Sequence, residues 1–454
     1  MQSLTNFFIG TAYALVAVAF VLGVMILVHE FGHYAVAKLC GVRVDVFSLG
    51  FGKRLFGFRR GDTDYRISAL PLGGYVKMAG ENPMEARTGD PSEFMSHPRW
   101  QRLLIAIAGP AMNILLAIGI VTGVFMVHYS HDWYLDQPTR VGWVDENSPA
   151  AKAGLKPGDL ITQIDGLTNP LWEDTKAKIA ISPGQPVDLV VKRGDQIINA
   201  TLVPDTYGPS RVGEAGVEPA AGITVEALEA SMPAQKAGIR KGDEILAING
   251  IGLHSIGELT HFLQDDKGKP VEITVMRDGK VAKYAMTPVL APNAEGVERY
   301  RIGFSPGVPQ HVDRLKFTQA LTRSIEQNKK YALLLVELVQ KMVERKVSVK
   351  MMSGPIDIAK VSGEAAREPG WTPLLLLMAG ISLNLGIFNL FPIPILDGGV
   401  ILLLLIEGLM RRDISLRIKE RIYQAAFVFL VLFAAMVIFN DITKTLPGLS
   451  KLLP

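Results

Sequence analysis

The sequence is short of cysteine and of charge. Cys40 is the only cysteine among 454 residues, which excludes an intramolecular disulfide framework and a cysteine-based zinc cluster, so any metal must be held by histidine and carboxylate. Charged residues make up only 20% of the chain and apolar residues 48%, which is too apolar for an ordinary soluble enzyme. The 47 basic and 44 acidic residues leave a formal net charge of +3, which gives no basis for a nucleic-acid partner. Composition therefore favours a membrane protein that carries soluble modules.

Four charge-free runs are long enough to cross the hydrocarbon layer, which takes about 20 apolar residues in a helix. They are Leu4–Val28, Leu103–Val127, Trp371–Leu396 and the shorter Tyr423–Asn440. The first run is expected to be retained rather than cleaved as a signal peptide, because no basic residue precedes it and no small-residue cleavage site follows it. The run Val400–Ile406 is expected to continue the third element or to pack beside it. The predicted class is a polytopic α-helical membrane protein with four transmembrane helices.

Basic residues near the span ends predict the orientation in the lipid bilayer. Eleven of them lie between Lys38 and Arg102 and five between Arg411 and Arg421, whereas none precedes the first span. Both basic loops should therefore face the cytoplasm, with both termini outside. The long segment 128–370 is then expected on the outer side, which is the periplasm in a bacterium with two membranes.

The segment between the second and third spans contains an internal repeat. Shifted by 84 residues, PAAKAGLKPGD (149–159) aligns with PAQKAGIRKGD (233–243). Each copy is typical of a strand, a short helix stopped by Gly, a Gly-Asp turn, an Ile-rich strand, a second helix and a closing hairpin. The pattern resembles tandem α+β PDZ domains of the bacterial kind, which bind an extended peptide or a free C-terminus by adding it as a strand. AAGITV (220–225) is the expected binding loop of the second copy and RVGWV (140–144) a weaker candidate in the first, although both copies could serve only to space or gate the membrane part.

His29-Glu30-Phe31-Gly32-His33 is the strongest local signal for chemistry. On a helix the two histidines share one face, so their imidazoles can hold one Zn²⁺ while Glu30 reaches a metal-bound water as general base. Two interfacial histidines at a helix end are the alternative. Three ionisable groups within five residues at the end of a membrane run are costly unless they face one another or a wet cavity, which favours a functional polar site.

A zinc site with two histidines and a water needs one more protein ligand, and a carboxylate in a membrane segment is the candidate. Asp397 lies about as far along the third run as His29 lies along the first, so the two are expected at similar depths. Asp397 could also cap the helix that follows it, and capping and ligation are compatible. Pro392 and Pro394 forbid a regular helix just before it, and unwound backbone at that depth is tolerated where it lines a cavity. Asn389 is placed to donate to a substrate carbonyl or oxyanion, or else to satisfy the broken backbone.

The loop after the first span alternates apolar and polar residues between glycines, which predicts a small sheet that reaches toward the membrane from the cytoplasmic side. A helical amide is wrapped and hydrogen-bonded, so a substrate span must unwind before it can be cut. An exposed strand edge would hold the unwound segment by main-chain pairing.

Together these motifs resemble the site-2 protease family of intramembrane zinc metalloproteases, and the likeness extends over essentially the full length. HEFGH (29–33) lies on the first span, AGPAMN (108–113) on the second and NLFPIPILDG (389–398) on the third. The resemblance implies that Glu30 is the catalytic base. It also implies three ligands for Zn²⁺, which are His29, His33 and Asp397. The substrate-binding residues that it implies are Asn389, Pro392, Pro394, Gly50, Phe51 and Gly52, although the glycines taken alone could mark only a bulge or a turn.

The resemblance further implies regulated intramembrane proteolysis in a bacterial inner membrane. The substrate would be a single-span membrane protein of the anti-sigma factor type, cut after a first extracytoplasmic cleavage, with remnant signal peptides as a further class. The PDZ pair would exclude substrates that still carry a bulky outer domain. A non-catalytic, membrane-anchored PDZ scaffold with a structural metal site is the alternative, and a transporter is disfavoured because the chain lacks inverted repeats.

The predicted domains follow from these elements. They are 1–40 (first span with HEFGH), 41–99 (membrane-associated β loop on the cytoplasmic side), 100–128 (second span), 129–207 (first PDZ module), 208–292 (second PDZ module), 293–370 (helical connector), 371–410 (third span), 411–422 (cytoplasmic loop) and 423–454 (fourth span and tail).

Overall fold

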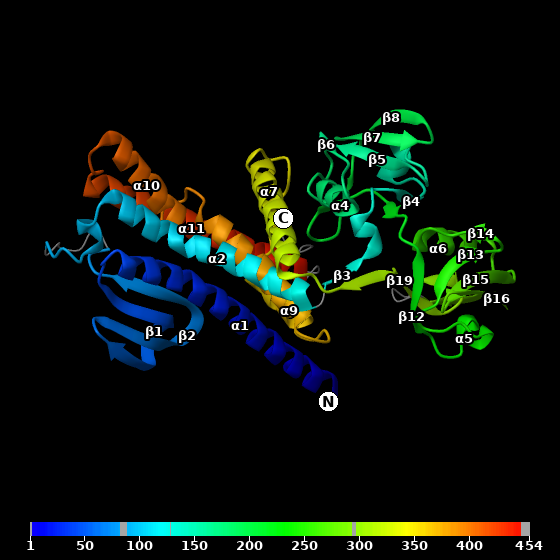
Figure 1. The fold of residues 1–454 in the computed structure, drawn as a ribbon, viewed down its shortest axis with the longest axis horizontal. Coiled ribbons are helices and arrows are strands. Elements are labelled where there is room, and N and C mark those ends of the chain that lie inside the picture. The colour runs from blue at the N-terminus through cyan, green and yellow to red at the C-terminus, as the bar shows by residue number, and fades with distance from the viewer. Residues whose placement is uncertain (1, 82–88, 128, 293–296, 446–454) are drawn as a thin grey trace. The chain divides into compact units, whose positions relative to one another are not determined.

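The computed structural model describes residues 2–81, 89–127, 129–292 and 297–445. The chain divides into two compact units, and many of their elements are labelled in Figure 1. Unit 1 contains residues 1–128, 314–339 and 352–454, and unit 2 contains residues 129–313 and 340–351. The domain boundaries predicted at 128 and 293 fall on residues outside the described part of the chain.

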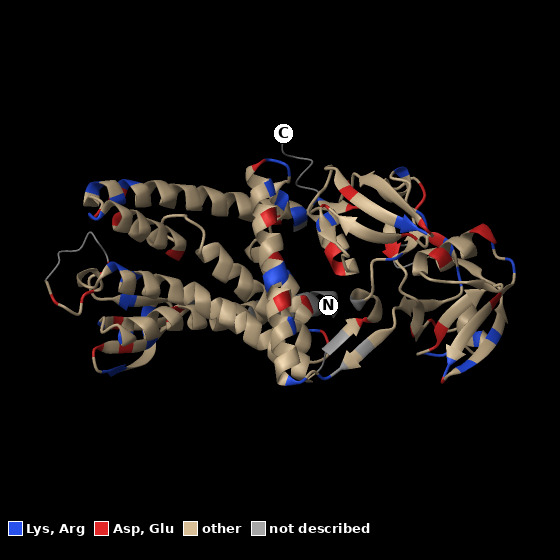
Figure 2. Cartoon of the chain, turned by 45° about the horizontal axis from the view of Figure 1, so that its top comes forward, with Lys and Arg blue, Asp and Glu red and all other residues tan. Residues whose placement is uncertain are grey.

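Unit 1 contains the membrane part. Within the described residues, four helices are long and apolar enough to cross a membrane, which confirms the four predicted spans. These helices are α1 (Gln2–Leu39), α2 (Arg99–Val127), α9 (Thr372–Asn389) and α11 (Leu416–Thr445). The other helices are α7 (Phe317–Val343), whose last residues belong to unit 2, α8 (Pro355–Ala365) and α10 (Asp397–Met410). Figure 2 shows that charged residues gather near the ends of the long apolar helices.

Glycines allow α1, α2 and α9 to pack closely. A Cβ on Gly32 of α1 would overlap the main-chain oxygen of Ala108 in α2. A Cβ on Gly386 of α9 would lie 2.9 Å from the main-chain oxygen of Pro110. Close backbone approach through small residues is a common way for helices to associate in a membrane. The first and third spans are thereby both held against the same stretch of α2, around Ala108 and Pro110.

The proline-containing segment separates α9 from α10. α9 ends at Asn389, and the turn 390–396 leads to α10, which begins at Asp397. A Cβ on Gly398 would overlap the main-chain oxygen of Phe391, so the turn folds back tightly onto the start of α10. The run Val400–Ile406 therefore lies in a separate helix that packs against α2, which resolves the two alternatives left by the sequence.

The predicted small sheet follows α1 and consists of β1 (Val44–Arg60) and β2 (Thr63–Met78). The first part of β1 lies between two parts of β2, because Phe47 has Tyr65 opposite it on one side and Val76 on the other. Segment 74–78 of β2 therefore forms an edge of the sheet. This edge faces α1, since the N–H of Val76 donates a 3.0 Å hydrogen bond to Oε2 of Glu30.

Unit 2 contains the repeat that the sequence predicts. Module 1 has a sheet with the strand order β6-β5-β7-β8, and module 2 has one with the order β16-β15-β13-β12-β19, with β14 beside β13. In module 1 the elements are β4 (Val141–Val144), α3 (Pro149–Lys152), β5 (Leu160–Ile164), β6 (Leu167–Thr168), α4 (Trp172–Ala180), β7 (Val187–Arg193) and β8 (Gln196–Leu202). Their counterparts are β12 (Ile223–Leu228), α5 (Pro233–Ala237), β13 (Glu244–Ile248), β14 (Ile251–Gly252), α6 (Ile256–Asp265), β15 (Val271–Arg277) and β16 (Lys280–Met286). From α3 onward the matched elements begin 84 residues apart, and a cluster of buried apolar side chains fills each module.

Short strands complete unit 2 outside the matched elements. They are β3 (Tyr129–Asp132), β9 (Asp205–Tyr207), β10 (Val212–Glu214), β11 (Val217–Pro219), β17 (Val289–Pro292), β18 (Glu298–Arg301), β19 (Phe304–Gly307) and β20 (Gln310–Asp313). After each module, a later, returning strand pairs antiparallel with the first strand of that module. In module 1 this strand is β11, which pairs with β4, and in module 2 it is β19, which pairs with β12.

The prediction that AAGITV (220–225) is the peptide-binding loop of the second copy requires a free edge on the strand that it leads into, and the structure leaves none. β12, which contains the last three residues of this segment, pairs with β13 on one side and with β19 on the other. RVGWV (140–144) is enclosed in the same way, because β4 pairs with β11 while Arg140 forms a bridge with Leu160. The returning strands, which sequence periodicity did not identify, occupy the edge where a peptide would have to bind.

Candidate metal centre and active site

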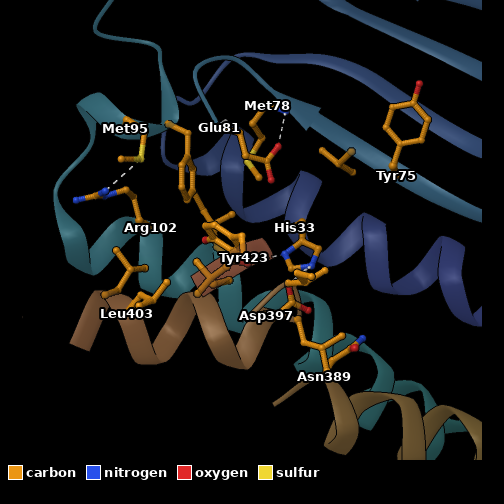
Figure 3. Close-up of a pocket in the computed structure, with 18 of the residues that line it drawn as sticks. His33, Tyr75, Met78, Glu81, Met95, Arg102, Asn389, Asp397, Leu403 and Tyr423 are labelled. Carbon is orange, nitrogen blue, oxygen red and sulfur yellow. Dashed lines mark hydrogen bonds and ion pairs between the residues drawn. The ribbon is translucent and has the colours of Figure 1, made fainter. Parts of the chain in front are cut away.

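Three side chains from distant parts of the sequence converge in unit 1. His29 and His33 lie on successive turns of α1, and Asp397 is the first residue of α10. Asp397 Oδ2 lies 3.2 Å from His29 Nε2, and Asp397 Oδ1 lies 3.4 Å from His33 Nε2. The two Nε2 atoms are 3.3 Å apart. Figure 3 shows Asp397 reaching toward His33, so the three predicted ligands are brought together.

A hydrogen bond to the backbone decides which nitrogen of His33 can bind a metal. Its Nδ1 lies 2.8 Å from the main-chain oxygen of Ile105, and because a carbonyl only accepts, Nδ1 carries the proton. Nε2 of the neutral ring then has a lone pair on the side of His29 and Asp397. Ligand atoms about 2.0–2.1 Å from a tetrahedral zinc lie roughly 3.3 Å apart, which matches the spacing of these three side chains. The donor set and its spacing fit zinc.

The alternative that Asp397 caps a helix is not what the structure shows. Leu396 occupies the N-cap position of α10, and no side-chain cap is formed there. The Asp397 carboxylate lies in the first turn of α10, where the helix N-terminus favours a negative charge. Both of its oxygens are directed at the imidazoles instead.

A cavity of about 450 Å³ lies beside the three side chains. Glu30 lines it, and its carboxylate is held by the N–H of Val76 at the edge of the small sheet. Tyr75 and Met78 from the same edge line the cavity as well. The sequence predicted that a strand edge would serve the site, but it did not indicate segment 74–78 as that edge. The only local signal there was the Gly73-Gly74 pair that precedes it.

The other predicted residues lie at different distances from this cavity. Asn389, at the end of α9, lines it, with Nδ2 3.5 Å from His29 Nε2. Pro392 and Pro394 lie in the turn before Asp397 and are not among the described residues that line the cavity. Segment Gly50–Gly52 lies in β1 and does not line it either. The ring of Phe51 nevertheless stacks on that of Tyr75, with 5.9 Å between ring centroids.

A buried ion pair lines the cavity farther along α10. Nζ of Lys419 in α11 lies 2.6 Å from Oε1 of Glu407 in α10, and the two side chains are only 9% and 1% exposed. The N–H of Ile414 donates to the same oxygen at 3.0 Å. The sequence placed both charges at the ends of apolar runs but gave no sign that they meet.

The family is shown by comparison with known proteins. The model of peptidase family M50 matches residues 17–433, and the chain belongs to this family. It is accordingly a zinc metalloprotease of the site-2 type, with apolar helices that place it in a membrane. The family resemblance inferred from the three motifs is thereby confirmed.

Curated relatives match over nearly the full length. "Regulator of sigma-E protease RseP" of Salmonella typhimurium is 33% identical, over 95% of this chain and 98% of that protein. The Escherichia coli protein of the same name is 32% identical, over 93% of this chain and 97% of that one. A Vibrio cholerae protein named "Putative zinc metalloprotease" is 32% identical, over 94% and 98%. Among solved structures, the PDZ domain of an SdrC-like protein from Listeria monocytogenes matches 19% of this chain and 87% of that chain, with 23% identity and a TM-score of 0.17.

Proposed function

We propose that this metalloprotease cuts a peptide bond within, or next to, the transmembrane segment of a single-span membrane protein. The convergence of His29, His33 and Asp397 beside Glu30 carries the proposal, because the two histidines and Glu30 lie on α1, which is long enough to cross a membrane, and Asp397 follows α9, which is another such helix. Ionisable groups in such a position are costly unless they serve a site.

His29, His33 and Asp397 would hold the zinc ion, which lowers the pKa of a water molecule and polarises a carbonyl when it is bound. Glu30 accepts the proton of the attacking water and returns it to the nitrogen of the leaving amine. The N–H of Val76 donates to Oε2 of Glu30 and so orients the carboxylate toward the cavity.

Asn389 and the sheet edge would position the substrate. The amide of Asn389 donates to the oxygen of the scissile carbonyl, which gains negative charge during the attack. Segment 74–78 accepts main-chain hydrogen bonds from the unwound substrate through its carbonyl oxygens, because the N–H groups of Val76 and Met78 already donate to Glu30 and Glu81. Gly50, Phe51 and Gly52 support that edge through the stacking of Phe51 on Tyr75. Pro392 and Pro394 keep the segment before Asp397 out of a helix, which leaves room for an extended substrate beside Asn389.

An anti-sigma factor is the proposed physiological substrate, and remnant signal peptides are a further class. The Salmonella and Escherichia coli relatives, each named "Regulator of sigma-E protease RseP", support this choice. The enzyme would lie in a bacterial inner membrane with its active site toward the cytoplasm and unit 2 in the periplasm, as the basic loops indicate. The two modules would act as PDZ domains that exclude substrates still carrying a bulky outer domain, so this cleavage follows a first one outside.

Module 2 is the better candidate for binding a free peptide end. A cavity of about 190 Å³ lies between α6 and the segment 299–306, where β19 is available as an edge strand. Module 1 offers less room, since a Cβ on Gly213 would overlap the main-chain oxygen of Ile179 in α4. Its returning strand is also engaged, because Glu218 accepts a 2.9 Å hydrogen bond from the N–H of Gly257 in α6.

The test is cleavage of a single-span anti-sigma-factor segment by the full chain in proteoliposomes, with fragments identified by mass spectrometry. Glu30→Gln should abolish the product while the protein still binds one zinc, and Glu420→Gln, an exposed carboxylate on α11, should leave cleavage unchanged. Absence of any Glu30-dependent product from the unchanged protein with every segment tried would refute the protease and favour the scaffold alternative.

A further inference from the structure

Asn113 is a buried polar residue of α2 that the proposed chemistry does not use. It belongs to the AGPAMN segment, its side chain is fully buried, and its Nδ2 lies 3.3 Å from Nδ1 of His29. Two contacts hold α2 at this position. Ser382 of α9 donates a 2.9 Å hydrogen bond to the main-chain oxygen of Asn113, and a Cβ on Gly109 would overlap the ring of His33. Asn113 is therefore held against Nδ1 of His29, the ring nitrogen that does not face Asp397.

The proton on His29 decides how this contact works. A neutral imidazole has one N–H donor and one lone pair, so Nε2 can bind a metal only if Nδ1 carries the proton. Nδ1 then needs an acceptor. The amide nitrogen of Asn113 is a donor and cannot fill that role, whereas its Oδ1 has no hydrogen-bond partner among the described residues. Rotation of the amide by half a turn about its last bond places Oδ1 against Nδ1 and satisfies both groups.

We infer that Asn113 positions His29 by accepting a hydrogen bond from its Nδ1–H, so that Nε2 of the ring is directed at the metal. Asn113 thereby does for His29 what the main-chain oxygen of Ile105 does for His33. The two ligands on α1 are both oriented by α2, one through its backbone and the other through a side chain. Acceptors behind a metal-bound histidine fix its ring and raise its basicity, and their loss typically weakens metal binding about 10–100-fold.

The inference rests on the proposed metal centre and can be tested without an activity assay. In the full chain in detergent, zinc affinity is measured by competition with a chelator. Asn113→Leu, which removes the acceptor, should weaken zinc binding about 10–100-fold. Asn113→Asp, which keeps an acceptor of the same size, should bind zinc at least as tightly as the unchanged protein. Thr122→Val is the matched control, because Thr122 is buried on the same helix and bonds only to the main-chain oxygen of Ile118 among the described contacts.

A second measurement needs no variant. In the unchanged protein loaded with zinc, ¹⁵N NMR of the imidazoles should show that both zinc-bound rings carry their proton on Nδ1. Coordination of either ring through Nδ1 would overturn the assignment. Equal zinc affinity of Asn113→Leu and the unchanged protein would overturn it too, as would an Asn113→Asp variant that folds but loses as much affinity as Asn113→Leu. If the unchanged protein binds no zinc at all, the proposed function fails rather than the role of Asn113 alone.

Discussion

Removal of Lys419 should destabilise the fold far more than removal of an exposed charge on the same helix. Lys419 and Glu407 are 2.6 Å apart and almost completely buried. At an effective dielectric constant of about 20, two unit charges at that distance attract by about 6 kcal/mol. Most of this attraction offsets the cost of taking both charges out of water, so the intact pair contributes little. Lys419→Met leaves the Glu407 carboxylate buried without its cation, which should cost about 3–5 kcal/mol of unfolding free energy.

A double-mutant cycle separates this cost from lost packing. Glu407→Leu together with Lys419→Met replaces both charges by apolar groups and should come within about 1 kcal/mol of the unchanged protein. Arg417→Met, an exposed position two residues away, should change stability by less than about 0.5 kcal/mol. The assay is reversible unfolding of the detergent-solubilised chain in increasing SDS, followed by circular dichroism. The reasoning is refuted if Lys419→Met behaves like Arg417→Met, or if the double variant costs as much as the sum of the single ones.

Three further outcomes are expected. Dialysis against a chelator should abolish proteolysis, and added Zn²⁺ should restore it; undiminished activity of the metal-free protein would contradict the proposed site. Gly32→Ala should lower the free energy of unfolding in SDS by about 1–3 kcal/mol and reduce cleavage, because the added Cβ overlaps the backbone of Ala108. The control Gly23→Ala, whose added Cβ meets no atom within 4 Å, should be neutral. Equal effects of the two variants would argue against the close approach of α1 and α2. Burial raises the pKa of Asp243, but hydrogen bonds from Arg277 and from the main chain lower it further, below its usual value. The stability from this pair is therefore present at neutral pH and begins to be lost as the pH falls below about 4. Arg277→Met should therefore cost more stability at pH 7 than in acid, as followed by hydrogen exchange of module 2, and a cost independent of pH would contradict this.

Much of the site could be predicted because its chemistry is concentrated in short motifs. The spacing of His29 and His33 is set by one turn of helix, so their shared face follows from the sequence alone. Asp397 required a long-range inference, which rested on the expectation that two apolar runs entering from the same membrane surface place their polar ends at similar depths. The repeat was visible for a related reason, since its glycines and apolar positions recur at one fixed interval.

The unpredicted features depend on contacts between elements that no local pattern specifies. β19 closes β12 because the chain returns after the second module, and nothing within AAGITV (220–225) indicates that return. Segment 74–78 becomes the edge beside Glu30 because the first part of β1 lies between two parts of β2. The pairing of Glu407 with Lys419 likewise arises only when α10 and α11 pack together. Each of these is a tertiary contact that overrides, or adds to, what propensity and periodicity can indicate.

The arrangement of the site explains why its polar groups can lie among apolar helices. Each one finds its partner on a different element: Glu30 on β2, His33 on the backbone of α2, and Asp397 on the two histidines of α1. A buried polar group without a partner costs free energy, so each of these side chains is stable in its position only when its partner is also in position. The residues that would perform the reaction therefore also hold α1, α2, β2 and α10 together. It follows that a ligand variant should lose stability as well as zinc. A variant of Asn389, whose side chain has a polar contact only with His29 among the described residues, should lose turnover with less loss of stability.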